Sequence, residues 1–149
     1  MKVFIKYNNN HCLPNIGDLV GVMWKENINF SKVADATSFR ECTTLSLAWD
    51  KWLDDERWIS HPKFKEYIYF DLKRKHIAVF NKMSMEIDDE AIEVDKRAFY
   101  KAVVYIAEIT QGKISLDGIG WLDSKDYAEN VKEYLKLSFE QANELSLSH

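Results

Sequence analysis

The residues able to act as nucleophiles or as acid–base catalysts are few and widely separated. Cys12 and Cys42 are thirty residues apart and lack CxxC spacing, and the histidines are scattered at positions 11, 61, 76 and 149. No GxSxG elbow marks a nucleophile. A triad of either cysteine with His61 or His76 remains an alternative, because triads assemble in space. We nevertheless predict no catalytic residue and expect both cysteines to be free, buried thiols.

Phosphate and metal sites are also not indicated. Gly112-Lys113 resembles the end of a P-loop, but the upstream glycine is missing and Ile114 occupies the Ser/Thr position. No HExxH sequence occurs, and the acidic residues lack the glycine and the spacing of an EF-hand. We therefore expect no metal and no cofactor.

His61 carries the enzymatic alternative. It precedes Pro62 and follows Trp58-Ile59-Ser60, so an aromatic ring lies close to an imidazole that can act as acid or base near neutral pH. A partly exposed loop histidine is the simpler interpretation and is favoured. A small enzyme with an unrecognised site near His61 is kept as a second hypothesis.

Charge is segregated along the chain. The acidic segment, residues 86–95, has a net charge of −6, whereas the whole chain has −4 and residues 60–85 have +4. A surface that meets a basic partner is one interpretation, because complementary fields raise the rate and selectivity of association. A solvated loop, whose last acids complement the N-terminus of a following helix, is the other. The acids of this segment are Glu86, Asp88, Asp89, Glu90, Glu93 and Asp95.

A second acidic stretch lies among tryptophans. Residues 49–58 contain Trp49, Trp52 and Trp58 together with four acids. Trp49 and Trp52 are at helical spacing and are expected in the core, whereas Trp58 lies beyond that helix. Aromatic side chains rimmed by acids are typical of protein-binding hot spots, although packing under a loop is the commoner role. The candidate partner-binding residues of this stretch are Asp54, Asp55, Glu56 and Trp58.

One short run is strongly basic. Lys73-Arg74-Lys75 would contact phosphate, or would keep the end of a hairpin exposed and unpaired. The acidic net charge and the lack of a longer basic stripe favour the second interpretation. We therefore predict no nucleic-acid partner.

The elements that would position these residues are hairpins and helices. In the first half of the chain, the patterns predict a strand over residues 2–7, a helix over 43–57 capped by Thr43 or Thr44, and a hairpin of 66–70 with 76–80. In the second half they predict a helix over 96–111, which is capped by Asp95 and ended by Gly112, and a helix over 124–145. Between these two helices, Asp117-Gly118 predicts a type I′ hairpin of 113–116 with 119–122. Residues 13–30 fit a strand or a helix. Segregated hairpins and helices predict an α+β fold with an antiparallel sheet packed by helices.

Length and composition indicate one domain over residues 1–149. A chain of this size buries a sizeable core, and only five Gly and two Pro argue against linkers. No signal peptide and no run of about 20 apolar residues is present, so we expect a cytoplasmic protein without a membrane partner. The oligomeric state is not indicated.

A resemblance favours one class of function. The segment Ala98–Trp121 resembles the helix, glycine and short hairpin pattern of several small cytoplasmic immunity proteins that bacteria pair with toxic nucleases. This resemblance, with the acidic segment, implies a non-catalytic inhibitor that masks the active site or substrate groove of a cognate toxin. A structural or assembly component of a phage or plasmid system is the third hypothesis, and it predicts a self-complementary patch.

Overall fold

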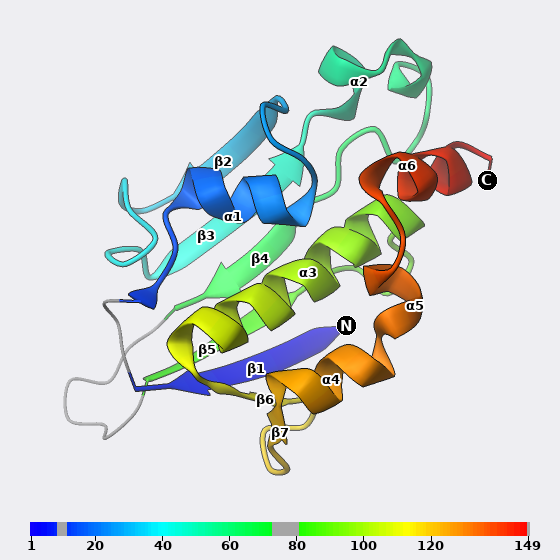
Figure 1. Cartoon of the computed structure of the whole chain (residues 1–149). Helices are drawn as coiled ribbons and strands as arrows, with labels where there is room; N and C mark the ends of the chain where they lie inside the picture. The colour runs from blue at the N-terminus through cyan, green and yellow to red at the C-terminus, as the bar shows by residue number, and fades with distance from the viewer. Residues whose placement is uncertain (9–11, 73–80, 149) are drawn as a thin grey trace.

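The architecture is a seven-stranded antiparallel sheet with helices packed on it (Figure 1). The computed structural model describes residues 1–8, 12–72 and 81–148. The strand order is β2-β3-β4-β5-β1-β6-β7, and every pair of neighbours is antiparallel. The predicted α+β class is confirmed. The strands are β1 Lys2–Tyr7, β2 Phe30–Ala34, β3 Thr44–Trp49, β4 Ile68–Asp71, β5 Asn81–Glu86, β6 Lys113–Ser115 and β7 Leu122–Asp123.

The core lies between the sheet and the helices α1 (Ile16–Met23) and α3 (Glu93–Thr110). Alternate residues of β1, namely Val3, Ile5 and Tyr7, are buried, as a strand covered on one face requires. Figure 1 shows α1 and α3 crossing the same face of the sheet. The first strand is therefore confirmed, and the open choice for residues 13–30 resolves into α1 followed by the start of β2.

Helix α3 confirms the predicted central helix with small corrections. It begins at Glu93, after Ile92 as its N-cap, and ends at Thr110, followed by the C-cap Gln111, whose φ of 53° is left-handed. The amide of Gly112 then donates to the carbonyl of Ala107 at 2.8 Å. Asp95 is wrong as a cap, because it lies inside the first turn with its side chain buried.

The predicted helix over residues 43–57 is wrong. Strand β3 occupies its first half, followed by α2 (Lys51–Asp54) and the 3-10 turn η2 (Glu56–Trp58). Leu45 and Leu47 alternate toward the core, a period of two that the tryptophan spacing obscured. Thr43 caps nothing helical; its amide donates to Asp35 at 2.9 Å. Pairing with β2 and β4 on both sides outweighs the local helical pattern.

The predicted C-terminal helix is broken into three. They are α4 Ser124–Asn130, α5 Lys132–Leu135 and α6 Phe139–Leu147. Val131 leaves the helical region with φ −114° and ψ 18°. Ser138 starts α6 afresh with a capping box, in which its hydroxyl accepts from the Gln141 amide at 3.0 Å. These breaks let the short helices pack around α3, with which each makes contact.

The predicted hairpin after α3 exists with shorter strands and another turn. Lys113 pairs with Asp123 and Ile114 with Leu122, so seven residues connect them. Gly118 has a φ of 82°, whereas Asp117 does not have the positive φ that a type I′ turn requires. Instead, the Asp117 carboxylate accepts from the amides of Ile119 and Gly120 at 2.8 and 2.9 Å.

The hairpin predicted for residues 66–70 and 76–80 is confirmed only in its first strand. Strand β4 pairs with β5, whose residues 81–86 follow the predicted second strand. The predicted strand 76–80 and the basic run Lys73-Arg74-Lys75 lie outside the described residues.

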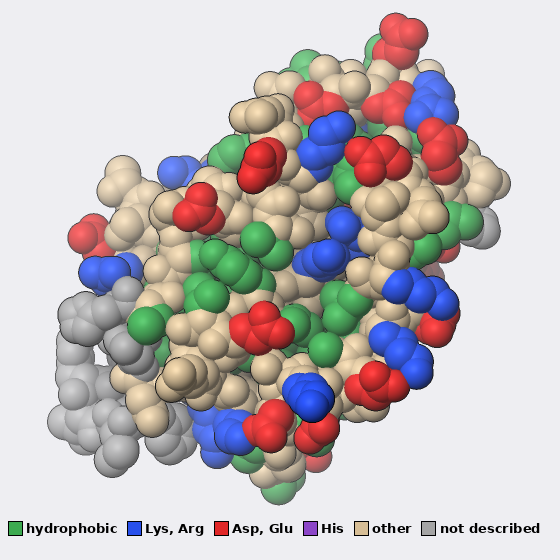
Figure 2. Space-filling view, viewed as in Figure 1, with side chains coloured by type: hydrophobic (Ala, Val, Ile, Leu, Met, Phe, Trp, Pro, Cys, Tyr) green, Lys and Arg blue, Asp and Glu red, His purple; other side chains and the backbone are tan. Residues whose placement is uncertain are grey.

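The sheet has a second face, here called the outer face, which the helices do not cover (Figure 1). In β1 it presents Lys2, Phe4 and Lys6, and in β4 it presents Tyr69 and Asp71. On the helix side, acidic and basic side chains are intermixed around a central apolar patch (Figure 2). Within the described ranges, each helix is too short or too polar to cross a membrane.

Candidate functional site

The acidic segment forms the wall of a broad, open hollow of about 810 Å³. Five carboxylates line it, and among the described residues no lysine or arginine side chain does. This acidic hollow lies where β4 and β5 approach the end of the outer face. Its lining residues are Met1, Glu66, Tyr69, Glu86, Ile87, Asp88, Asp89 and Glu90.

Strand register and a tight loop position these carboxylates. Glu86, the last residue of β5, lies between Tyr69 of β4 and Lys2 of β1. Ile87, buried after it, donates its amide to the Met1 carbonyl at 3.0 Å. Asp88 then accepts from the Glu90 amide at 2.8 Å. The loop is therefore anchored on the sheet, and its acids point to solvent as an ordered set.

The carboxylates differ in how readily they ionise. Burial raises the pKa of Glu66, although Lys63, 3.7 Å away, opposes this. A hydrogen bond from the N-terminal ammonium, 2.5 Å from Asp89, lowers the pKa of that carboxyl. Asp89 is therefore ionised but paired with the ammonium group, and Tyr69, with 53% of its surface exposed, offers an aromatic ring beside the carboxylates.

The last two acids of the segment do not join the hollow. Glu93 is the first residue of α3 and is half-buried. Asp95 is fully buried, and its carboxylate lies 2.8 Å from Nζ of Lys51, which is also fully buried. Of the sequence-predicted residues, the structure brings together Glu86, Asp88, Asp89 and Glu90, which a contiguous acidic run already indicated.

Sequence reasoning missed four lining residues, Met1, Ile87, Glu66 and Tyr69, of which the last two add a carboxylate and an aromatic ring. Both come from β4 or the loop before it, in a stretch with more lysines than acids. No local signal marks them, because the pairing of β4 with β5 brings them to the acidic segment.

The second predicted stretch, residues 54–58, is mostly committed to internal contacts. Asp54 accepts from Nε1 of Trp49 at 2.8 Å and from the Asn29 amide at 2.9 Å. Trp58 is fully buried, which corrects its predicted place at the surface. Its Nε1 donates to Asn143 of α6 at 2.9 Å. Glu56 is exposed, and none of residues 54–58 lines the acidic hollow.

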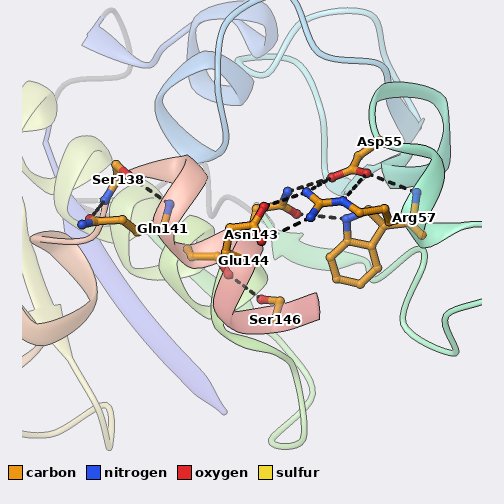
Figure 3. Close-up of polar contacts among 9 residues, drawn as sticks. Asp55, Arg57, Ser138, Gln141, Asn143, Glu144 and Ser146 are labelled. Atoms are coloured by element: carbon orange, nitrogen blue, oxygen red, sulfur yellow. Dashed lines mark hydrogen bonds and ion pairs between the residues drawn. The ribbon is translucent and has the colours of Figure 1, made fainter. Parts of the chain in front are cut away.

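A polar network fixes α6 against the turn η2 (Figure 3). Arg57 donates to Asp55 at 2.8 Å and to Glu144 at 2.7 Å, and Asn143 donates to Asp55 at 3.0 Å. The hydrogen bond from Arg57 lowers the pKa of Asp55 to about 2. The network ties the C-terminal helix α6 to the turn η2.

We expect this network to make stability depend on pH. The folded-state pKa of Asp55, about 2, lies below its ordinary value of 3.8, so its stabilisation is complete above pH 3.8 and is lost as pH falls toward 2. Asp55→Asn should lower the free energy of unfolding at pH 7 by about 1–2 kcal/mol, since Arg57 is half-exposed. Urea unfolding at pH 7 and pH 3 measures this. An unchanged difference between wild type and variant at the two pH values would contradict it.

Of the groups considered for catalysis, His76 lies outside the described residues. Cys42 is buried, but Cys12 is exposed, which corrects the expectation for that thiol. His61 packs on Trp58 with ring centres 4.6 Å apart, and its Nδ1 accepts from the Lys63 amide at 3.0 Å. It does not line the acidic hollow. Among the residues that the structure describes, no three His, Cys, Asp or Glu side chains are grouped to hold a metal ion.

Comparison of the chain with protein-family models, with curated protein sequences and with solved structures finds no match.

Proposed function

We propose that this chain is a non-catalytic inhibitor that binds a basic protein, in the manner of the immunity proteins that neutralise bacterial toxins. The observation that carries the proposal is the acidic hollow, where five carboxylates surround an exposed tyrosine. A surface of this kind fits lysine or arginine side chains of a partner, such as the substrate groove of a nuclease.

The physical argument has two steps. Carboxylates of one sign around a concave surface focus the field and raise the rate of encounter with a basic partner. An exposed tyrosine then supplies contact area and a ring face for a cation, which slows dissociation. Masking follows because a basic groove occupied by these carboxylates is closed to a nucleic-acid substrate.

The first experiment is capture of partners from the host lysate by the tagged chain, at low and at moderate salt. The proposal predicts one basic protein whose retention weakens with salt. Its identity is then established by mass spectrometry, and the toxic activity of the purified partner is measured with and without the chain. Inhibition at equimolar concentration is the expected result.

Charge reversal tests the surface. Asp88→Lys, Asp89→Lys and Glu90→Lys together should lower the association rate with that partner by about 10- to 100-fold, because steering is lost. Surface plasmon resonance measures the rate. The matched control reverses three exposed helix-side acids, Glu108, Glu129 and Glu133, and should change the rate little. Equal affinity of the hollow variant and wild type would refute this choice of surface.

A further inference from the structure

Strand β2 forms one rim of the sheet (Figure 1). It pairs with β3 on one side, and in the described part of the chain no strand lies on its other side. The amide of Asp50 donates to the carbonyl of Asn29 at 2.9 Å, so these two residues form a hydrogen-bonded pair. Hydrogen-bonded and non-hydrogen-bonded pairs alternate along an antiparallel ladder. Counted from Asn29, it is therefore Ser31 and Val33 whose backbone groups bond to β3.

Three residues of β2 are left with outward-facing backbone groups. By the same alternation, the N–H and C=O groups of Phe30, Lys32 and Ala34 point away from β3. The pairing of β3 agrees with this assignment. The amide of Leu72 donates to the carbonyl of Thr43 at 2.8 Å, so β3 uses its odd-numbered residues toward β4 and its even-numbered residues toward β2. A row of outward-facing donors and acceptors is a template for another strand.

The side chains of this edge include exposed apolar groups and carry no net charge. Val33, on the outer face, is 61% exposed, and Phe30, which faces the helix side, is 37% exposed. Residues 30–36 contain one lysine and one aspartate, so their net charge is zero, whereas the whole chain has −4. A strongly basic or acidic segment finds no complementary charge here. A second copy of the same neutral, apolar edge meets it without repulsion between net charges.

Self-pairing of β2 about a twofold axis has a preferred register. An axis at Lys32, the centre of the strand, sets that lysine opposite its own copy, and like charges directly opposite destabilise a sheet. An axis at Val33 instead sets Lys32 opposite Ala34 as a hydrogen-bonded pair, in which both residues use their outward groups. The two Val33 side chains then face each other in a non-hydrogen-bonded pair, where side chains lie closer. The register centred on Val33 is therefore the favoured one.

We infer that two copies of the chain associate through β2, antiparallel and with the twofold axis at Val33, so that the sheet continues from one copy into the other. An isologous contact of this kind closes at two copies. The strands that meet are short, so we expect a reversible dimer and not an obligate one. The inference is independent of the proposed inhibitor function, because the acidic hollow lies at β4 and β5 and does not use β2.

The first test is sedimentation velocity of the full chain over a series of concentrations, with proline and alanine compared at position 32. Lys32→Pro removes an outward N–H that β3 does not use, so the fold should persist while the dissociation constant of the dimer rises about tenfold or more. Lys32→Ala keeps that N–H and should dimerise at least as well as the wild type. A monomer at every concentration up to millimolar, dimerisation of the proline variant equal to wild type, or an equal loss in the alanine variant would overturn the inference.

A cross-linking test needs no proline and reports the register. Val33→Cys, in a Cys12→Ser background because Cys12 is exposed, should form a covalent dimer on mild oxidation. A non-hydrogen-bonded pair brings two Cα atoms to about 4.5 Å, within disulfide range. Leu116→Cys in the same background is the matched control, since Leu116 is 60% exposed but lies between β6 and β7, and it should stay largely monomeric. Absence of the Val33→Cys cross-link, or equal rates for the two variants, would contradict the edge pairing.

Discussion

Replacing Asp95 with alanine is expected to lower the free energy of unfolding by about 3–5 kcal/mol, because it leaves a buried ammonium without its partner. Lys51 and Asp95 are both fully buried and lie 2.8 Å apart. Asp95 also accepts from Nε1 of Trp24 at 3.2 Å. Urea unfolding followed by tryptophan fluorescence measures the loss.

Two further variants separate the buried charge from other causes. Asp89→Ala, at an exposed carboxylate, should cost far less stability than Asp95→Ala. The double variant Lys51→Met with Asp95→Leu removes both charges and should recover most of the stability that Asp95→Ala loses. If the double variant is no more stable than Asp95→Ala, lost packing and not the unpaired ammonium explains the cost.

Gly112→Ala is expected to destabilise the fold by about 1–3 kcal/mol, since the new methyl group meets backbone that cannot rotate away. A Cβ at this position would lie 2.5 Å from the carbonyl oxygen of Lys6 and 3.0 Å from Oγ1 of Thr110. Gly112 lies between the end of α3 and β6, so relief requires α3 or β1 to shift. Thermal unfolding followed by circular dichroism is the measurement.

Gly21→Ala is the matched control. Gly21 is inside α1, and its added Cβ would meet only Cγ of Glu26 at 3.5 Å, an ordinary contact. Alanine should therefore stabilise the chain by about 0.5–1 kcal/mol, because glycine is the poorer helix former. Equal effects of the two substitutions would show that the close approach to Lys6 does not matter.

The sequence predicts a secondary-structure element correctly where its apolar residues follow a single spacing, either helical or strand-like. In α3, Phe99, Val103 and Ile106 recur at helical spacing, and all three are buried. Residues 43–57 mislead because Trp49 and Trp52 suit a helix while Leu45 and Leu47 suit a strand. Only pairing with β2 and β4, both distant in sequence, decides between the two patterns.

In the candidate site, too, residues adjacent in sequence were predictable, whereas residues placed by long-range contacts were not. Asp88, Asp89 and Glu90 are adjacent in sequence, so their common surface follows from the acidic run. The buried position of Asp95 could not be predicted from the acidic run. Its side chain turns into the core, where it forms an ion pair with the buried Lys51.

The position of β1 in the sheet has a consequence for how the chain is built during synthesis. Lys2 pairs with Glu86 and Phe4 with Ser115, so β1 is made long before either of its neighbours. Until β5 and β6 emerge from the ribosome, the buried residues of β1 have no ladder partner and β4 lacks its inner neighbour. Such long-range closure slows folding and exposes unpaired strand edges in the meantime. The nascent chain is therefore most prone to aggregate before residue 115 is synthesised, and substitutions in β6 should lower yield more than their effect on equilibrium stability implies.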